Sequence, residues 1–269
     1  MSVINLSLLG CDSYEEFLAI VEECNQTNET TFLPGTRLPV ELFHSEGLAV
    51  DYPLHFYLPF DYDPQKSYPV IFILDGEWHF ETFANELDRS QNEAIIIGVA
   101  NYDLDGYDHR EKYFRLPNSS QYFDFLQYEL IPYIDQRFSI LPSFRVLAGH
   151  SFAGLFVIQA LLMDKQVPRT FNYYVSFDGS FWAHPDVTAA FVGLSVDKDK
   201  KLKSSLLLLG ATEIQGNDLS VDWLNQLFTT ADFSELTIEK WRYKVDHLDI
   251  VETAITDVVQ WFDFNDNCQ

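Results

Sequence analysis

Cysteine is scarce in this sequence: Cys11, Cys24 and Cys268 are the three cysteines in a chain of 269 residues. An odd number without the spacing of zinc ligands argues against both a disulfide framework and a cysteine-based metal site. We therefore predict no metal and no cofactor. Free thiols are typical of a reducing compartment, which favours the cytoplasm.

Long apolar runs are also missing. No segment approaches the roughly 18 consecutive apolar residues that predict a membrane span. The first residues, MSVINLSLLGCDSYEEF, carry no basic region and only a short apolar stretch, which is unlike a signal peptide. We therefore expect a cytoplasmic protein that has no membrane partner.

Positive charge is the third feature in short supply. The chain has 17 Lys and Arg against 41 Asp and Glu, a formal net charge of −24. Such a surface repels phosphate backbones and anionic lipid, which argues against nucleic acid and membrane surfaces as partners. A small-molecule ligand remains the expected kind of partner.

Apolar and aromatic residues are plentiful. Hydrophobic residues make up 47% of the chain and aromatic residues 16%, enough to bury a large core. No repeat or low-complexity linker divides the sequence. Ser13 and Glu16 form a capping box before helically spaced apolar residues, so we predict a helical extension over residues 1–35 and one domain over 36–269.

Apolar strands alternate with helices through most of that domain. The predicted strands cover residues 40–47, 52–60, 68–76, 93–101, 144–150, 173–179, 204–211 and 236–245. The predicted helices cover 122–138, with a kink or restart at Pro132, then 153–163, a segment around 221–228, and 250–262. The alternation predicts an α/β fold with a mostly parallel central sheet and helices on both faces.

Ser151 lies between a predicted strand and a predicted helix, the context of a nucleophile elbow. Strand and helix can approach closely there because the neighbours are small. The pattern G-x-S-x-G is met at Gly149 and Ser151 and has Ala153 in place of the second glycine. We expect Ser151 to be a nucleophile; the alternative is a small-residue turn with a capping serine.

A serine nucleophile needs a base that is oriented by a carboxylate. In this fold the acid and then the histidine follow later strands. Glu213 and Asp218 follow the strand 204–211, and His247 follows the last strand. The sequence therefore predicts a triad of Ser151, His247 and Glu213, with Asp218 as the alternative acid.

An oxyanion hole needs two backbone N–H groups. Phe152, directly after the nucleophile, offers one, and Gly76 or Glu77, in the turn after the strand 68–76, offers the other. Four aromatic side chains are candidates for a wall around an acyl or aryl group, with burial in the core as the alternative: Trp78, Phe152, Phe181 and Trp182.

With these residues assembled, the chain resembles the putative esterase family of α/β-hydrolases. The likeness covers roughly residues 38–265 and is carried by FILDGEWHF, IIIGVAN, VLAGHSFAGLF, VSFDGSFW, LLGATE and DHLDI. LDGEW, GHSFAG and SFDGSFW look most like its siderophore-esterase branch, and S-formylglutathione hydrolase is another member. Many members carry an arginine-rich stretch after the fourth strand, which here is matched loosely by Arg110 and Arg115.

The resemblance implies the α/β-hydrolase fold and a serine carboxylesterase. It places the nucleophile at Ser151, the base at His247 and the acid at Glu213, with Arg110 near the substrate. The expected substrate is a small soluble ester or a siderophore-like ester. The alternatives are a thioesterase or acyltransferase that uses the same triad, and a binding module that uses the fold without catalysis.

Overall fold

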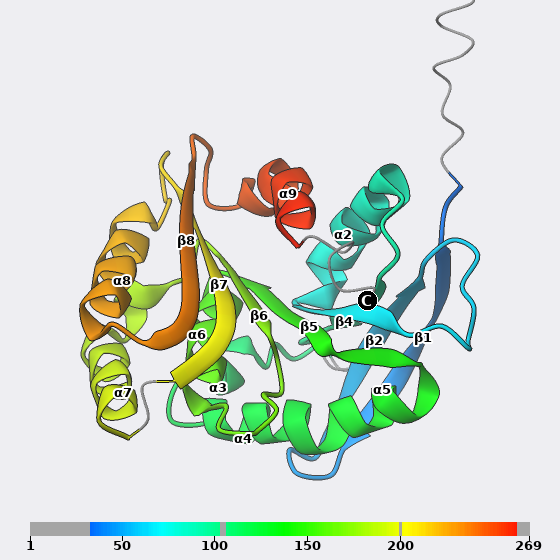
Figure 1. The fold of residues 1–269 in the computed structure, drawn as a ribbon, viewed down its shortest axis with the longest axis horizontal. Helices are drawn as coiled ribbons and strands as arrows, with labels where there is room; N and C mark the ends of the chain where they lie inside the picture. Colours follow the sequence, from blue (N-terminus) through cyan, green and yellow to red (C-terminus); the bar gives the residue numbers. More distant parts are fainter. Residues whose placement is uncertain (1–32, 103–105, 199–200, 263–269) are drawn as a thin grey trace, which may run out of the picture. The chain divides into compact units, whose positions relative to one another are not determined.

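An eight-stranded sheet forms the centre of the computed structural model, which describes residues 33–102, 106–198 and 201–262 (Figure 1). The strands are β1 (Thr36–Ser45), β2 (Val50–Leu58), β3 (Tyr68–Leu74), β4 (Ile95–Val99), β5 (Ile140–His150), β6 (Tyr173–Phe177), β7 (Lys201–Ala211) and β8 (Ser234–Tyr243). Their order across the sheet is β1-β2-β4-β3-β5-β6-β7-β8. β1, β2 and β4 pair antiparallel, and all other pairs are parallel. The prediction of a mostly parallel sheet is confirmed.

The chain divides into two units, Met1–Leu33 and Pro34–Gln269. The predicted helix that begins with Ser13 lies outside the described residues, as do the three cysteines. The sheet and its helices all belong to the second unit.

Helices cover both faces of the sheet (Figure 1). They are α2 (Gly76–Ser90), α3 (Arg110–Tyr113), α4 (Ser119–Phe125), α5 (Ile131–Arg137), α6 (Phe152–Met163), α7 (Pro185–Lys198), α8 (Asp218–Ala231) and α9 (Ile250–Trp261), with a π-helical segment η2 (Leu126–Leu130) and a 3-10 turn η3 (Phe181–Ala183). α2 and α9 pack on one face, and α4, α6 and α8 pack on the other. None of the helices in the described part of the chain is long and apolar enough to cross a membrane.

β3 shows how a strand serves both layers. Val70, Phe72 and Leu74 belong to the core under α4 and α6, whereas Ile71 and Ile73 belong to the core under α2 and α9. Successive side chains of a strand point to opposite faces, so a strand buried on both sides is apolar at every position. This is why the continuous apolar runs of the sequence predicted central strands correctly.

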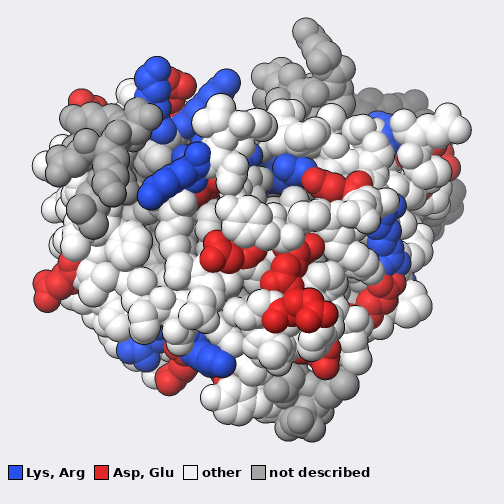
Figure 2. Space-filling model, turned by 90° about the horizontal axis from the view of Figure 1, so that it is seen from below, with Lys and Arg blue, Asp and Glu red and all other residues white. Residues whose placement is uncertain are grey.

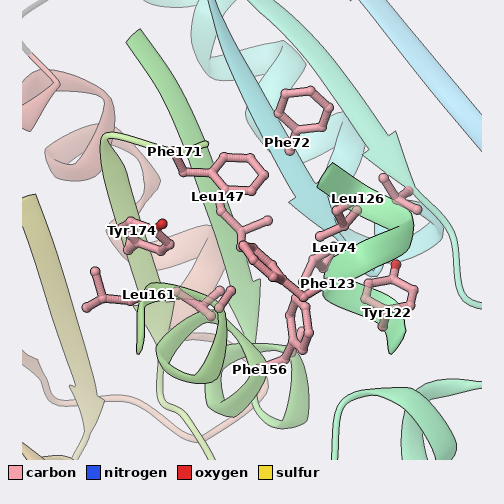
Figure 3. Close-up of a cluster of buried hydrophobic side chains, with 14 of the residues drawn as sticks. Phe72, Leu74, Tyr122, Phe123, Leu126, Leu147, Phe156, Leu161, Phe171 and Tyr174 are labelled. Carbon is pink, nitrogen blue, oxygen red and sulfur yellow. The ribbon is translucent and has the colours of Figure 1, made fainter. Parts of the chain in front are cut away.

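The larger core is rich in aromatic side chains (Figure 3). Phe72 of β3 meets the Phe171 ring edge-on at 5.6 Å between centroids, and Tyr122 of α4 meets the Phe156 ring of α6 edge-on at 5.1 Å. Rings of this size bury much apolar surface, and edge-on contact is a favoured geometry for them. The core thereby holds α6, and the residue that precedes α6, against β5.

The helices differ from the sequence prediction in several places. α2 starts where only a turn was predicted, and α7 was not predicted. The predicted helix 122–138 is instead three segments, α4, η2 and α5, with Pro132 in the first turn of α5. Proline has no N–H to donate to the preceding turn, and the wider π-helical turn before it accommodates that gap without ending the helix.

The face drawn in Figure 2 carries acidic side chains mainly near its centre and basic side chains mainly towards its margins. The basic groups do not form a continuous patch on this face. Its charge distribution therefore agrees with the net charge of −24, which disfavours polyanionic partners.

Candidate active site

Ser151 has a strained backbone between β5 and α6. Its φ is 61° and its ψ is −117°, a region that non-glycine residues rarely adopt. Close packing supports this turn: a Cβ added to Gly149 would lie 2.7 Å from the carbonyl carbon of Ala153. The turn thus presents Ser151 at the carboxyl end of β5, in the context of strand, turn and helix that the sequence predicts.

His247 lies in the loop between β8 and α9, and a buried carboxylate holds its ring. The Nδ1 atom of His247 is 2.6 Å from Oδ2 of Asp178. Asp178, which directly follows β6, is fully buried and also accepts hydrogen bonds from the backbone N–H groups of Ala211, at 2.8 Å, and Asn217, at 2.9 Å. With Nδ1–H donated to Asp178, the Nε2 atom of a neutral His247 is an acceptor.

The acid predicted from the sequence needs correction. Glu213 lies on the surface, where its carboxylate is 4.0 Å from Nζ of Lys244. Asp218, at the start of α8, pairs with Lys240 and Arg242, each at 3.0 Å. The carboxylate that contacts Nδ1 of His247 is that of Asp178, which directly follows β6.

The position of Asp178 in the sequence carries a signal for a site residue. It follows an apolar strand directly and precedes Gly179, as a residue at the active edge of a parallel sheet does. Its motif, SFDG, was read for its family likeness only. Asp178 follows β6, whereas the predicted acids Glu213 and Asp218 follow β7, the next strand along the chain.

Ser151 and His247 line one cavity of about 400 Å³. Its ten lining residues are Trp78, His79, Thr82, Arg110, His150, Ser151, His247, Leu248, Val251 and Glu252. The Oγ atoms of Ser151 and Ser180 are 3.2 Å apart at its margin. The structure thus brings the predicted nucleophile and base together with two of the predicted substrate-binding residues, Trp78 and Arg110.

The predicted oxyanion-hole residues begin two helices. Gly76 and Glu77 start α2, and Phe152 starts α6. N–H groups in the first turn of a helix have no acceptor within the helix, so they can donate elsewhere. A Cβ on Gly76 would lie 2.6 Å from the carbonyl carbon of Gly98, so only glycine allows α2 to begin this close to β4. Burial raises the pKa of Glu77, whose carboxylate accepts from the backbone N–H of Asn101 at 3.2 Å.

Arg110 is held by a buried carboxylate, Asp75. Its Nε and Nη2 atoms lie 2.7 and 3.0 Å from the two oxygens of Asp75, which is fully buried. Burial raises the pKa of Asp75 to about 7, and the guanidinium opposes that rise. The same guanidinium stacks on Trp78 at 4.9 Å from its ring centre. Arg110 therefore lines the cavity with its guanidinium bound to Asp75 and stacked on Trp78.

A second set of side chains flanks Phe152. Trp182 is 59% exposed, its ring centre lies 6.2 Å from that of Phe152, and its Nε1 donates to Asn217 at 3.0 Å. Arg115 stacks over Phe152 at 5.3 Å and donates from Nε to Nε2 of His184 at 3.1 Å. Phe181, by contrast, is fully buried, so for this residue the alternative prediction, burial in the core, is confirmed. Trp182 and Arg115 thus border the nucleophile on the side of η3.

Arg115 differs from the other arginines of the chain. The seven others form ion pairs with carboxylates: Arg37, Arg89, Arg110, Arg137, Arg145, Arg169 and Arg242. Among the described residues, no carboxylate pairs with Arg115. In a chain with 41 acidic side chains, a cation beside the elbow with no carboxylate partner is available to a negatively charged ligand.

Three histidine rings lie in a row in the cavity. The ring centres of His79 and His150 are 5.4 Å apart, and those of His150 and His247 are 4.4 Å apart. Burial, together with the nearby Arg110, lowers the pKa of His79 to about 4, and burial with the neighbouring His247 and His79 lowers the pKa of His150 to about 3. Both rings are therefore neutral near pH 7. In the described part of the chain, no three His, Cys, Asp or Glu side chains converge as a metal site.

Known proteins resemble this chain in sequence and in fold. A family model described as "Putative esterase" matches residues 45–244. Ferri-bacillibactin esterase BesA of Bacillus subtilis is 25% identical over 222 residues, which cover 70% of this chain and 74% of that protein. Among solved structures, the BES protein from Bacillus cereus has a TM-score of 0.71 at 20% identity and covers 83% of this chain and 94% of its own. Siderophore hydrolase EstB from Aspergillus nidulans has a TM-score of 0.70 at 17% identity, with coverage of 86% and 96%.

The two kinds of match carry different weight. The structural matches establish the α/β-hydrolase fold. Because their sequence identities are low, they establish the fold alone. The family model spans most of the chain, from the end of β1 to just after β8. The chain therefore belongs to the putative esterase family and is a serine hydrolase that cleaves ester bonds.

Proposed function

We propose that this protein hydrolyses a small carboxylic ester through an acyl-enzyme on Ser151, with His247 as the base and Asp178 as the acid that orients it. The observation that carries the proposal is the 2.6 Å contact between His247 and Asp178 in the same cavity as the strained Ser151. A serine hydroxyl is a weak nucleophile by itself and becomes reactive when an oriented histidine takes its proton.

The first half of the reaction forms the acyl-enzyme. Ser151 Oγ attacks the ester carbonyl carbon while its proton passes to Nε2 of His247. The carbonyl oxygen becomes negative, and the N–H groups of Phe152 and of Gly76 or Glu77 donate to it. His247 then gives the proton to the oxygen of the leaving alcohol, and the ester C–O bond breaks.

The second half releases the acid. A water molecule loses a proton to His247 and attacks the acyl carbon, and the same N–H groups hold the second oxyanion. The proton returns to Ser151 Oγ as the acyl–enzyme bond breaks. Asp178 stabilises the imidazolium in both halves, because its carboxylate accepts from Nδ1–H throughout.

For the substrate we propose a siderophore-like ester whose acyl part is aromatic and negatively charged. Arg115, which pairs with no carboxylate among the described residues, and the exposed Trp182 support this, since a guanidinium binds anions and an indole stacks on aryl groups. The printed name of BesA, a ferri-bacillibactin esterase, is in keeping with such a substrate. We propose the cytoplasm as the site of action. The odd number of cysteines supports this proposal, because it is not typical of a disulfide framework.

Labelling with a fluorophosphonate probe tests the proposal. We expect the full-length wild type to be labelled stoichiometrically and Ser151→Ala to remain unlabelled, with Ser180→Ala as the matched control that retains the label. A wild type that stays unlabelled, or a Ser151→Ala variant that labels equally, would indicate a binding module instead. Rates on p-nitrophenyl acetate, S-formylglutathione and a catecholate siderophore, measured side by side, then separate ester hydrolysis from thioester cleavage and acyl transfer.

A further inference from the structure

His150 is a buried polar side chain that the proposed mechanism does not use. It is the last residue of β5, is 5% exposed and directly precedes Ser151. Its Nε2 atom lies 2.8 Å from the backbone oxygen of His247. A carbonyl oxygen only accepts, so Nε2 of His150 carries the hydrogen and donates it.

The loop that carries His247 has few other anchors. Between the end of β8 and the start of α9, three of the residues around His247 are exposed: Asp246, Leu248 and Asp249. On the side of β7, the N–H groups of Thr212 and Glu213 bond to the backbone oxygens of Tyr243 and Val245, at 3.0 and 3.1 Å. On the side of the nucleophile, the bond from His150 is the one that holds the main chain of this loop in the described structure.

Two contacts together define the place of the His247 imidazole. Asp178 fixes the orientation of the ring through Nδ1, and His150 fixes the position of the main chain through its oxygen. Because His150 and Ser151 are consecutive, the second contact fixes the position of the His247 main chain relative to Ser151. The two rings also pack against each other at 4.4 Å between centres.

We propose that His150 is a positioning residue that ties the loop of the general base to the nucleophile elbow through its Nε2–H. This inference rests on the proposed function, because it gives His247 the role of base. Burial and the neighbouring His247 and His79 lower the pKa of His150 to about 3, so the ring donates in its neutral form. A neutral ring also places no charge against His247 when that residue takes up the proton from Ser151.

Two amide variants test the proposal, because they place the same group at different distances from the backbone. In His150→Gln the side-chain nitrogen reaches the position of Nε2, whereas in His150→Asn it reaches only that of Nδ1. We expect His150→Asn to lower kcat by about 10- to 100-fold with KM changed less than about twofold, since small displacements of a catalytic group cost rate more than binding. We expect His150→Gln to keep kcat within about threefold of the wild type.

Hydrogen exchange supplies a readout that does not depend on turnover. Backbone amides of residues 244–249 should exchange faster in His150→Asn than in the wild type, and at the wild-type rate in His150→Gln. Equal exchange and equal kcat in the two variants would overturn the proposal, as would an effect on KM alone. Failure of the proposed function is recognised separately, because it leaves wild-type Ser151 unlabelled by fluorophosphonate whatever the exchange rates are.

Discussion

At the scale of single residues, Asp178 serves the fold and, in the proposed mechanism, also the reaction. One carboxylate oxygen accepts from the backbone of Ala211, and the other faces His247. Backbone N–H donors compensate the buried charge, so the carboxylate can stabilise an imidazolium without a neighbouring cation. This also explains why an exposed Glu213 is a poor substitute: its charge is solvated and lies beside the exposed Lys244.

Asp178→Asn should lower kcat by about 10⁴-fold, because an amide next to Nδ1 favours the wrong tautomer of His247. Steady-state kinetics on p-nitrophenyl acetate measures this effect. Glu213→Gln is the matched control and should leave kcat within about twofold, since its nearest cation is the exposed Lys244. A large loss in Glu213→Gln with a small one in Asp178→Asn would return the acid role to Glu213.

Arg115 should set the preference for negatively charged acyl groups. Arg115→Gln should lower kcat/KM about 5- to 10-fold for an ester with an anionic acyl part and leave a neutral ester nearly unchanged, because a partly exposed ion pair contributes about 1 kcal/mol. The ratio of the two kcat/KM values is the measurement. Arg137→Gln, which removes a cation paired with Glu41 elsewhere, should leave that ratio unchanged.

At the scale of elements, the elbow depends on the contact between β5 and α6. Gly149 of β5 lies so close to Ala153 of α6 that a methyl group does not fit, whereas Ala153 replaces the second glycine of the motif without disturbing the turn. The departure from G-x-S-x-G therefore falls at a position where the structure has room for one Cβ.

Gly149→Ala should reduce the free energy of unfolding by about 1–3 kcal/mol and lower kcat, because the extra methyl group pushes α6 and Ser151 away from β5. Urea denaturation measures the first effect. Gly193→Ala in α7 is the control: nothing lies within 4 Å of the added Cβ, so it should raise stability by about 0.5–1 kcal/mol. Equal effects of the two substitutions would show that the elbow is not tightly packed.

At the scale of the whole molecule, the buried histidines make stability depend on pH. His79 and His150 have pKa values of about 4 and about 3 in the folded protein, below the ordinary value of 6.5. Between these values the unfolded chain binds more protons than the folded one, so stability rises with pH. The contribution of both residues is complete above about pH 7 and is lost as the pH falls from 6.5 towards 4.

His79→Phe should flatten this dependence. The wild type should lose about 2 kcal/mol more than the variant between pH 7.5 and pH 5, because the variant lacks one group that the unfolded state protonates. Urea denaturation at the two pH values measures the difference. His44→Gln, which removes an exposed histidine paired with Asp51, should not flatten it. If the free energy of unfolding falls equally with pH in the wild type and in His79→Phe, His79 takes up its proton as readily in the folded protein as in the unfolded chain.

Sequence patterns predicted the parts of this protein that depend on local rules. Apolar runs predicted the strands because burial on two faces requires them, and small residues around Ser151 predicted the turn because a strained elbow needs them. His247 was identified by its place after the last strand. By contrast, α2 was missed because its residues follow a glycine turn directly.

The sequence by itself determined the fold class and predicted Ser151 and His247 as the nucleophile and the base, since each of these features leaves a periodicity or a local motif. Only the tertiary structure decided that Asp178 and not Glu213 orients His247, that Arg110 is paired with Asp75, and that His150 reaches the His247 main chain. These are contacts between residues far apart in the chain, and their distances depend on how neighbouring strands and loops pack at one edge of the sheet. No local pattern encodes that packing, because it depends on contacts throughout the core.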